Sequence, residues 1–287
     1  MRIRAGLLAA SLAFCAAGDA RAQADPAKQG ELIFNIGGCT NCHTAKGGQL
    51  LAGGDPLRTP FGSFYPPNIT PDPETGIGGW SEADLARAMR EGKAPDGTPF
   101  YPSFPYTSYT HLTDEDVRAL KAYLDTVPPV RQPSKPHELG FPYSQRWGLH
   151  AWQLAFFEPA RFQPDPAKDA AWNRGAYLVE GPGHCQECHT PRNLAGARQA
   201  DRAFAGGPDP SDATGKKTIP NITQDPDVGL GKWEESDIVT VLTLGMLPDG
   251  DFIGGEMAKV VTNATGKLPP EDVQAIATYL KSLPAQR

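Results

Sequence analysis

Apolar residues recur every three or four positions in several stretches of this 287-residue chain, a spacing typical of half-buried α-helices. Ser81 begins a segment that resembles a capping box, Thr113 can cap a second helix, and Pro269 begins a third. Their apolar faces are Leu85, Ala88 and Met89 in the first, Val117, Leu120 and Leu124 in the second, and Val273, Ile276 and Leu280 in the third. Shorter helices are expected over residues 27–35 and 170–179. Alternating strand patterns are absent, so the sequence predicts an all-α fold.

The same pattern occurs twice along the chain. Pro67-Asn68-Ile69-Thr70 returns as Pro220-Asn221-Ile222-Thr223, and Trp80 and Trp233 follow these segments at the same offset. Residues 112–124 (LTDEDVRALKAYL) likewise match residues 268–280 (LPPEDVQAIATYL). Internal similarity on this scale indicates a duplicated domain. We therefore expect one domain over residues 23–130 and a second over residues 170–287.

Residues 131–169, between the two copies, form a proline-rich segment. It also contains the large aromatic residues Trp147, Trp152, Phe156 and Phe157. A solvated linker rarely carries so many aromatic side chains. We expect this connector to pack across both domains and to fix their relative placement, and a surface for docking a partner is the alternative.

A Cys-X-X-Cys-His pentapeptide lies near the start of each copy. The first is Cys39 to His43, and the second is Cys185 to His189. This spacing is the attachment signature of c-type haem. Two thiols can reach the two vinyl groups of one porphyrin, and the following histidine is placed as an axial iron ligand. The sequence thus predicts two covalently bound haem c groups, on Cys39, Cys42, Cys185 and Cys188, with His43 and His189 as iron ligands.

Two other kinds of site use paired cysteines. Four cysteines can bind zinc, but zinc pairs are usually much closer in sequence than Cys42 and Cys185. A redox-active dithiol would require a βαβ context, and no strand-like run accompanies either motif. Both alternatives also leave the histidine after each pair unexplained. Haem is therefore favoured.

The amino terminus resembles a signal peptide. Arg2 and Arg4 precede an apolar run, and Ala20-Arg21-Ala22 offers a cleavage site, so residues 1–22 are expected to be removed. The run is too short to span a bilayer. Haem is attached to thiols after export in bacteria, so both signals predict a periplasmic protein. A lipid anchor on Cys15 is the alternative, although Phe14 is bulky where a small residue is expected.

The chain carries a formal charge of minus six, and loss of residues 1–22 would make it minus eight. Such a charge disfavours binding to nucleic acid or to an anionic membrane surface. It favours a protein partner with a basic docking patch, although solubility alone could also explain it. Association with a membrane is expected only through partner proteins.

The second motif and its surroundings resemble the cytochrome c subunits of periplasmic alcohol dehydrogenases and related membrane-associated dehydrogenases. The resemblance rests on Gly183 to Asn193 (GHCQECHTPRN), the two Pro-Asn-Ile-Thr segments, the loop from Tyr101 to Tyr106 and the loop from Gly254 to Met257. It covers essentially the whole mature chain and implies two tandem cytochrome c domains. It also implies a carrier that takes electrons from a dehydrogenase and passes them to the respiratory chain, through a cytochrome or a terminal oxidase. Many relatives have three haem domains, whereas this chain has two.

The second haem is expected to take Met257 as its distal ligand, because the family places its distal methionine in that loop and a thioether is a soft ligand. Met246 is the alternative. The matching residue in the first domain is Phe104, which cannot bind iron, although relatives often carry methionine in that loop. His111 is the favoured replacement, with Met89, His137, His150 or an unligated iron as the others. Asn68 and Asn221 are expected near the haem propionates.

Two functions fit these features. The first is an electron carrier with no substrate chemistry of its own. The second is a dihaem enzyme, peroxidase-like or oxidising sulfur compounds, in which the first haem is catalytic. Four cysteines remain outside the predicted leader and all belong to the motifs, which argues against a thiolate-ligated sulfur enzyme. Phe104 keeps the enzyme in consideration, because a five-coordinate iron could bind peroxide.

Overall fold

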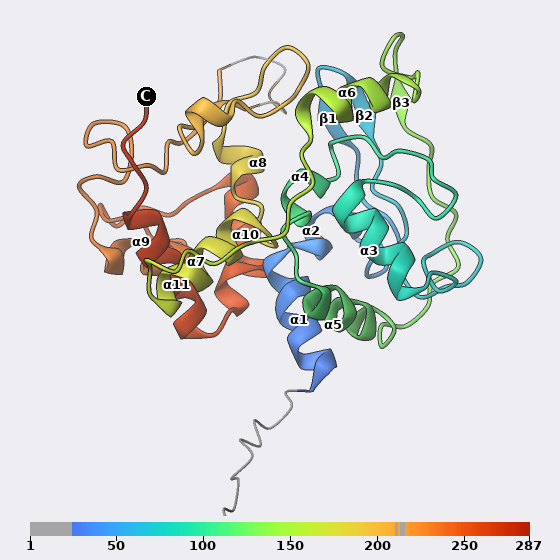
Figure 1. Ribbon diagram of the computed structural model, residues 1–287, viewed down its shortest axis with the longest axis horizontal. Coiled ribbons are helices and arrows are strands. Elements are labelled where there is room, and N and C mark those ends of the chain that lie inside the picture. Colours follow the sequence, from blue (N-terminus) through green and yellow to red (C-terminus); the bar gives the residue numbers. More distant parts are fainter. Residues whose placement is uncertain (1–24, 210–211, 213–215) are drawn as a thin grey trace, which may run out of the picture.

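The computed structural model describes residues 25–209, 212 and 216–287 (Figure 1). The expected signal peptide, residues 1–22, and the possible lipid anchor at Cys15 lie outside the described residues. Figure 1 shows residues 25–130 on one side of the molecule and residues 170–287 on the other. We call these the N-terminal half and the C-terminal half.

The same crossing of two helices organises each half. Helix α1 (Pro26–Ile36) packs on α5 (Asp114–Leu124), and α7 (Ala170–Glu180) packs on α11 (Pro270–Lys281). A glycine lies at each crossing. A Cβ atom on Gly30 would come within 2.0 Å of the Ala119 carbonyl oxygen, and one on Gly175 within 1.9 Å of the Ala275 carbonyl oxygen. Only glycine allows the two backbones to approach so closely.

The other helices connect these pairs. They are α2 (Cys39–His43), α3 (Glu82–Glu91), α4 (Tyr106–Tyr109), α8 (Gln186–His189), α9 (Glu235–Leu244) and α10 (Gly255–Asn263), with 3₁₀ turns at Ala200–Arg202 and Thr265–Lys267. The helix starts expected from the sequence are present. Ser81 and Asp84 form a capping box at the start of α3, and the Thr113 hydroxyl accepts a hydrogen bond from the Asp116 amide at the start of α5.

Short strands accompany the helices, and the expectation of an all-α fold did not include them. Strands β1 (Leu57–Thr59), β2 (Gly62–Phe64) and β3 (Glu138–Leu139) form an antiparallel sheet in that order. Strands β4 (Gly207–Pro208) and β5 (Thr218–Ile219) form a second, two-stranded sheet. Strands of two or three residues are too short to produce a readable alternation of apolar and polar positions.

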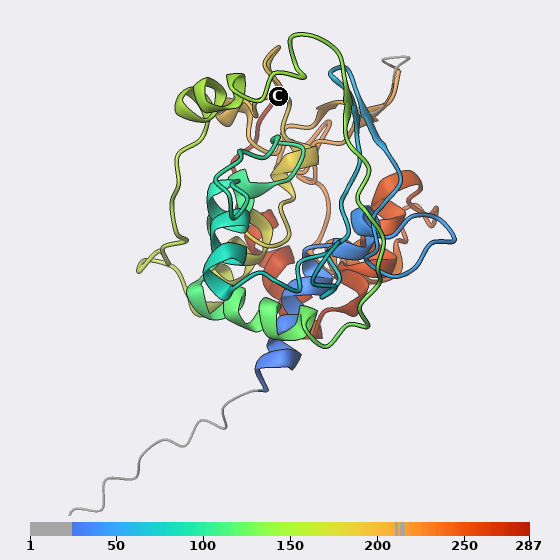
Figure 2. The ribbon, with the colours of Figure 1, turned by 90° about the vertical axis from the view of Figure 1, so that its right-hand side faces the viewer.

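The connector passes the first sheet on its way to the C-terminal half. Figures 1 and 2 show the chain rising from the end of α5, past the strands, to α6 (Gly148–Phe156). Helix α6 contacts both halves, because Gln153 donates a hydrogen bond to the Glu91 carbonyl (3.1 Å) and the Trp152 indole donates one to the Ala195 carbonyl (2.8 Å). Tyr106 packs edge-on against Phe157. Side-chain contacts therefore tie the connector to both halves.

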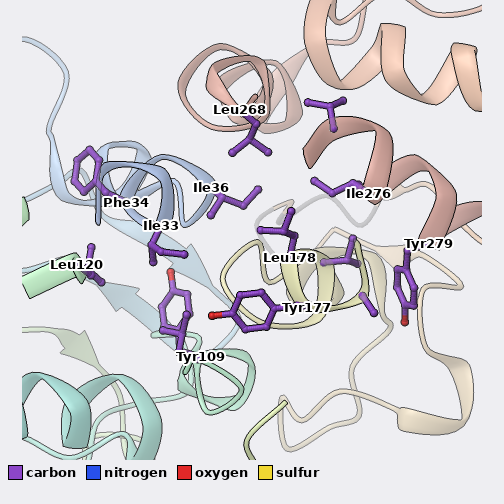
Figure 3. Close-up of a cluster of buried hydrophobic side chains, with 14 of the residues drawn as sticks. Ile33, Phe34, Ile36, Tyr109, Leu120, Tyr177, Leu178, Leu268, Ile276 and Tyr279 are labelled. Atoms are coloured by element: carbon purple, nitrogen blue, oxygen red, sulfur yellow. The ribbon is translucent and has the colours of Figure 1, made fainter. Parts of the chain in front are cut away.

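One hydrophobic core runs through both halves (Figure 3). The N-terminal half contributes residues such as Ile33, Ile36 and Tyr109, and the C-terminal half contributes Leu178 and Ile276 among others. The two halves are consequently joined by buried apolar surface as well as by the connector. Within the described part of the chain, no helix is both long enough and apolar enough to cross a membrane.

Candidate haem sites

Each Cys-X-X-Cys-His motif lies on a single helical turn. Cys39 and Cys42 lie three residues apart on α2, and Cys185 is the residue that directly precedes α8. Residues three apart on a helix share one face, so the two thiols of each motif can meet one planar ligand. None of the four motif cysteines forms a disulfide. The residue before each motif, Gly38 or His184, has a left-handed backbone, with φ of 57° and 40°.

The two motif histidines are held in the same way. The ring Nδ1 of His43 lies 2.7 Å from the Pro67 carbonyl oxygen, and that of His189 lies 2.8 Å from the Pro220 carbonyl oxygen. A carbonyl accepts a hydrogen bond, so Nδ1 carries the proton and Nε2 remains a lone-pair donor for a metal. Burial lowers the pKa of both imidazoles and favours this neutral form, although each carbonyl partly opposes the shift.

The proline carbonyls come from the repeated Pro-Asn-Ile-Thr segments, a role that the sequence did not reveal. The asparagine of each segment fixes the loop. The Asn68 amide donates to the Val130 carbonyl (2.7 Å), the Asn221 amide donates to the Gln286 carbonyl (2.7 Å), and both asparagines are buried. Each asparagine thus ties its loop to the segment that follows the last helix of its half, α5 or α11. These contacts are structural, and a position near haem propionates stays a prediction.

Met257 lies in the first turn of α10, whereas the sequence suggested a loop. Its side chain is partly buried against the core, as is that of Phe104, the matching residue in the N-terminal half. The Phe104 ring packs on Phe100 and Tyr109, with centroids 5.7 and 5.6 Å away. The alternative methionines differ: Met246 is exposed, and Met89 is buried in the core. Ligation by Met257 remains a prediction.

His111 lies where α4 leads into α5. Its backbone carbonyl accepts a hydrogen bond from the Phe162 amide, and its Cβ packs against Gly181, at the end of α7. Burial lowers its pKa, and its buried Nδ1 atom has no hydrogen-bond partner. A hydrogen bond with the Ala160 backbone partly opposes the lowering of the His111 pKa. Phe162 belongs to the connector and Gly181 follows α7, so His111 lies where these segments meet. Ligation of the first haem by His111 stays a prediction.

The two connector histidines have other surroundings. His137 accepts a hydrogen bond from the Tyr65 amide at 3.1 Å, and its ring lies edge-on to Phe64 and Tyr101. His150 is exposed on α6. Packing therefore accounts for His137, and neither histidine is needed to explain the motifs.

A buried charge cluster lies beside the second motif. The Glu187 carboxylate pairs with Arg192 and Arg198. Burial would raise the pKa of Glu187, but the two guanidinium groups and a hydrogen bond from Thr107 outweigh it and hold the pKa at about 2. Glu187 is therefore ionised throughout the neutral range. Sequence reasoning did not single it out, because Thr107 and Ser108, which donate hydrogen bonds to it, lie about 80 residues away in the other half.

The donor set matches covalent haem better than a zinc site. Each motif brings two thiols to one helical face beside an imidazole whose Nε2 is free, as haem attachment and axial ligation require. Across residues 25–209, 212 and 216–287, no three His, Cys, Asp or Glu side chains are grouped so that they could hold a metal ion. The described residues consequently assemble no four-cysteine zinc site.

Comparison with known proteins agrees with this chemistry. The cytochrome c family model matches residues 27–128 and again residues 172–284. The chain belongs to the cytochrome c family. It therefore binds haem covalently, and the two matched regions agree with the duplication seen in the sequence. Both matches begin within the first helix of their half and end beyond α5 and α11, respectively.

Several curated proteins are similar to this cytochrome. A diheme cytochrome c-type protein of Cereibacter sphaeroides is 49% identical over 265 residues, which cover 90% of this chain and 86% of that protein. The cytochrome c subunit of a quinone alcohol dehydrogenase from Gluconacetobacter polyoxogenes is 43% identical, over 90% of this chain and 56% of the subunit. The cytochrome c subunit of a gluconate 2-dehydrogenase from Pantoea cypripedii is 41% identical, over 98% of this chain and 64% of that subunit. The chain thus spans less than two thirds of the length of these two dehydrogenase subunits.

Proposed function

We propose that this cytochrome carries two haem c groups and transfers electrons from a dehydrogenase to the respiratory chain in the periplasm. The duplicated Cys-X-X-Cys-His motif, with each histidine held by a proline carbonyl, carries the proposal. The similar dehydrogenase subunits support a dehydrogenase as the electron donor. A cytochrome or a terminal oxidase is the proposed acceptor.

Each residue has a defined task in this proposal. Cys39, Cys42, Cys185 and Cys188 form the thioether links. Nε2 of His43 and of His189 would hold the iron, while the carbonyl on Nδ1 fixes the ring and would raise its basicity. Bound haem supplies the redox chemistry, exchanging one electron as its iron alternates between the ferric and ferrous states. The protein positions the haems, limits access of water and sets their potentials.

The acidic surface fits a partner with a basic docking patch. The chain has a formal charge of minus six, and haem propionates add further negative charge. Opposite charges on two redox proteins accelerate their encounter, and salt screens the effect. Electron transfer to this cytochrome should therefore slow as the ionic strength rises.

A dihaem enzyme is the second candidate, because Phe104 provides no ligand where the matching residue in the other half is Met257. The absorption and electron paramagnetic resonance spectra of the oxidised holoprotein separate the two. Two low-spin haems that are reduced by a quinone-linked dehydrogenase and reoxidised by bacterial membranes are the expected result. A high-spin haem together with turnover of hydrogen peroxide would overturn the carrier and support the enzyme.

A further inference from the structure

Each haem motif forms hydrogen bonds with the other half of the molecule through its third residue. The Oδ1 atom of Asn41 accepts a hydrogen bond of 2.7 Å from Nδ2 of Asn263. The Oε1 atom of Glu187 accepts bonds of 2.6 Å from the Thr107 hydroxyl and 2.9 Å from the Ser108 hydroxyl. Asn41 and Glu187 occupy the same place in their motifs, so the two sets of contacts are reciprocal.

The helices that these hydrogen bonds reach are α10, which contains Met257, and α4, which begins just after Phe104. Met257 and Phe104 are the matching residues of the two halves. Asn263 is the last residue of α10, and Met257 lies in the first turn of the same helix. Thr107 and Ser108 belong to α4, which begins two residues after Phe104. In both directions, therefore, the motif of one half supports the helix that adjoins the distal position of the other half.

Further contacts hold the two motifs together. The ring Nε2 of His184, the residue before Cys185, lies 3.2 Å from the carbonyl oxygen of Gly37, two residues before Cys39. The His184 ring also packs edge-on against Tyr109 of α4. Helix α10 also packs beside α2, the helix that carries the first motif. The two motifs thus contribute hydrogen bonds and a ring contact to the interface that the apolar core also forms.

We propose that Asn41 and Glu187 are positioning residues, each of which braces the distal side of the haem site in the opposite half. The inference rests on the proposed attachment of the two haems and on Met257 as the distal ligand of the second one. If the Asn41–Asn263 bond is removed, α10 has one restraint fewer and the bond between Met257 and iron should weaken. A thioether ligand raises the reduction potential, so the potential of the second haem should fall.

The variant Asn41→Ala tests this inference, with Thr40→Ala as the matched control in the same motif. Three quantities are measured on each holoprotein: haem content, the far-red charge-transfer absorbance of a methionine-ligated ferric haem, and the two reduction potentials. Both variants should retain two haems. In Asn41→Ala the equilibrium constant for binding of Met257 to iron should fall about fivefold, as expected for the loss of one hydrogen bond. At 59 mV per tenfold, that shift lowers the potential of the second haem by at most about 40 mV.

Asn263→Ala removes the donor of the Asn41–Asn263 hydrogen bond from outside the haem motif. It therefore tests the same bond even if Asn41→Ala fails to attach haem. It should lower the same absorbance and the same potential, and the double variant should add nothing to either single change. The inference is overturned if Asn41→Ala matches Thr40→Ala in absorbance and potential, or if the two asparagine changes are additive. A wild type without the far-red absorbance would likewise refute bracing of a methionine ligand. These readouts need no dehydrogenase, so they stand apart from any failure of the proposed function.

Discussion

Replacing Gly175 by alanine tests the helix crossing that builds the C-terminal half. The new Cβ atom would lie 1.9 Å from the Ala275 carbonyl oxygen and 2.9 Å from the Tyr279 Cβ atom. The first of these neighbours is backbone, which cannot rotate away as a side chain can. Since real Cβ contacts essentially never fall below 3.0 Å, α7 and α11 must separate by about 1 Å.

Two opposing effects determine the magnitude. Overpacking at a rigid backbone contact should cost about 3 kcal/mol, the upper end of the usual range. Alanine is the better helix former by about 1 kcal/mol, which offsets part of that cost. The free energy of unfolding should therefore fall by about 2 kcal/mol. For a protein of this size that corresponds to a decrease in Tm of about 4–8 °C.

Thermal and guanidinium unfolding of the holoprotein, followed by far-ultraviolet circular dichroism, would measure the change. Gly148→Ala is the control, because Gly148 begins α6 and a Cβ atom there meets nothing within 4 Å. This control should be neutral or slightly stabilising. If Gly175→Ala were as stable as Gly148→Ala, the close approach of α7 and α11 would not be a feature of the folded protein, and the reasoning would be wrong.

Three further predictions concern the haems. Cys185→Ala with Cys188→Ala should leave one haem per chain by pyridine haemochrome assay, and two haems would contradict the assignment. Met257→Ala should lower the reduction potential of the haem on His189 and allow carbon monoxide to bind its iron. If both reduction potentials are unchanged and no carbon monoxide adduct forms, another residue is the ligand. The haem on His43 should have a lower potential than the haem on His189, because a thioether favours ferrous iron. Electrons should then enter at the haem on His43 and leave at the haem on His189. Redox titration of the two single-haem variants, Cys39→Ala with Cys42→Ala and Cys185→Ala with Cys188→Ala, would assign each potential, and a higher potential for the haem on His43 would reverse that direction.

Local features of the fold could be predicted from the sequence because their causes lie within a few residues. The capping box of α3 needs only Ser81 and Asp84, three positions apart. The glycine-mediated helix crossing is a different case. Gly30 and Gly175 lie in expected helices, but their close approach depends on Ala119 and Ala275, which are far away in sequence. The pattern predicted the helices and not how closely they pack.

The site shows the same limit. The motifs identified the thiols and the two histidines, because their chemistry is encoded in side chains at fixed spacing. The carbonyls of Pro67 and Pro220 hold those histidines through the backbone, and a backbone role leaves little trace in residue type. The repetition of Pro-Asn-Ile-Thr was the available signal. The repetition indicated that the segment has a role in each half, but not that its proline carbonyl oxygen accepts the hydrogen bond from the motif histidine.

The two halves share the contacts that position their motif histidines, and they differ in the residues through which each motif contacts the other half. Both histidines rest on a proline carbonyl, and both loops are tied down by an asparagine. At the interface, by contrast, the first motif offers neutral Asn41 where the second offers ionised Glu187. The matching residues at the expected distal positions differ in the same way, with Phe104 in one half and Met257 in the other.

These differences matter because identical haem sites would have similar potentials and give an electron little preference for either. A buried carboxylate with two arginines beside the second motif, and Met257 at the position where the other half has Phe104, make the two halves electrostatically and chemically unequal. The reciprocal hydrogen bonds join each motif to the other half, so a change at one motif should alter both halves. Duplication thus accounts for the two similar motifs, and the differences between Asn41 and Glu187 and between Phe104 and Met257 make the two halves unequal.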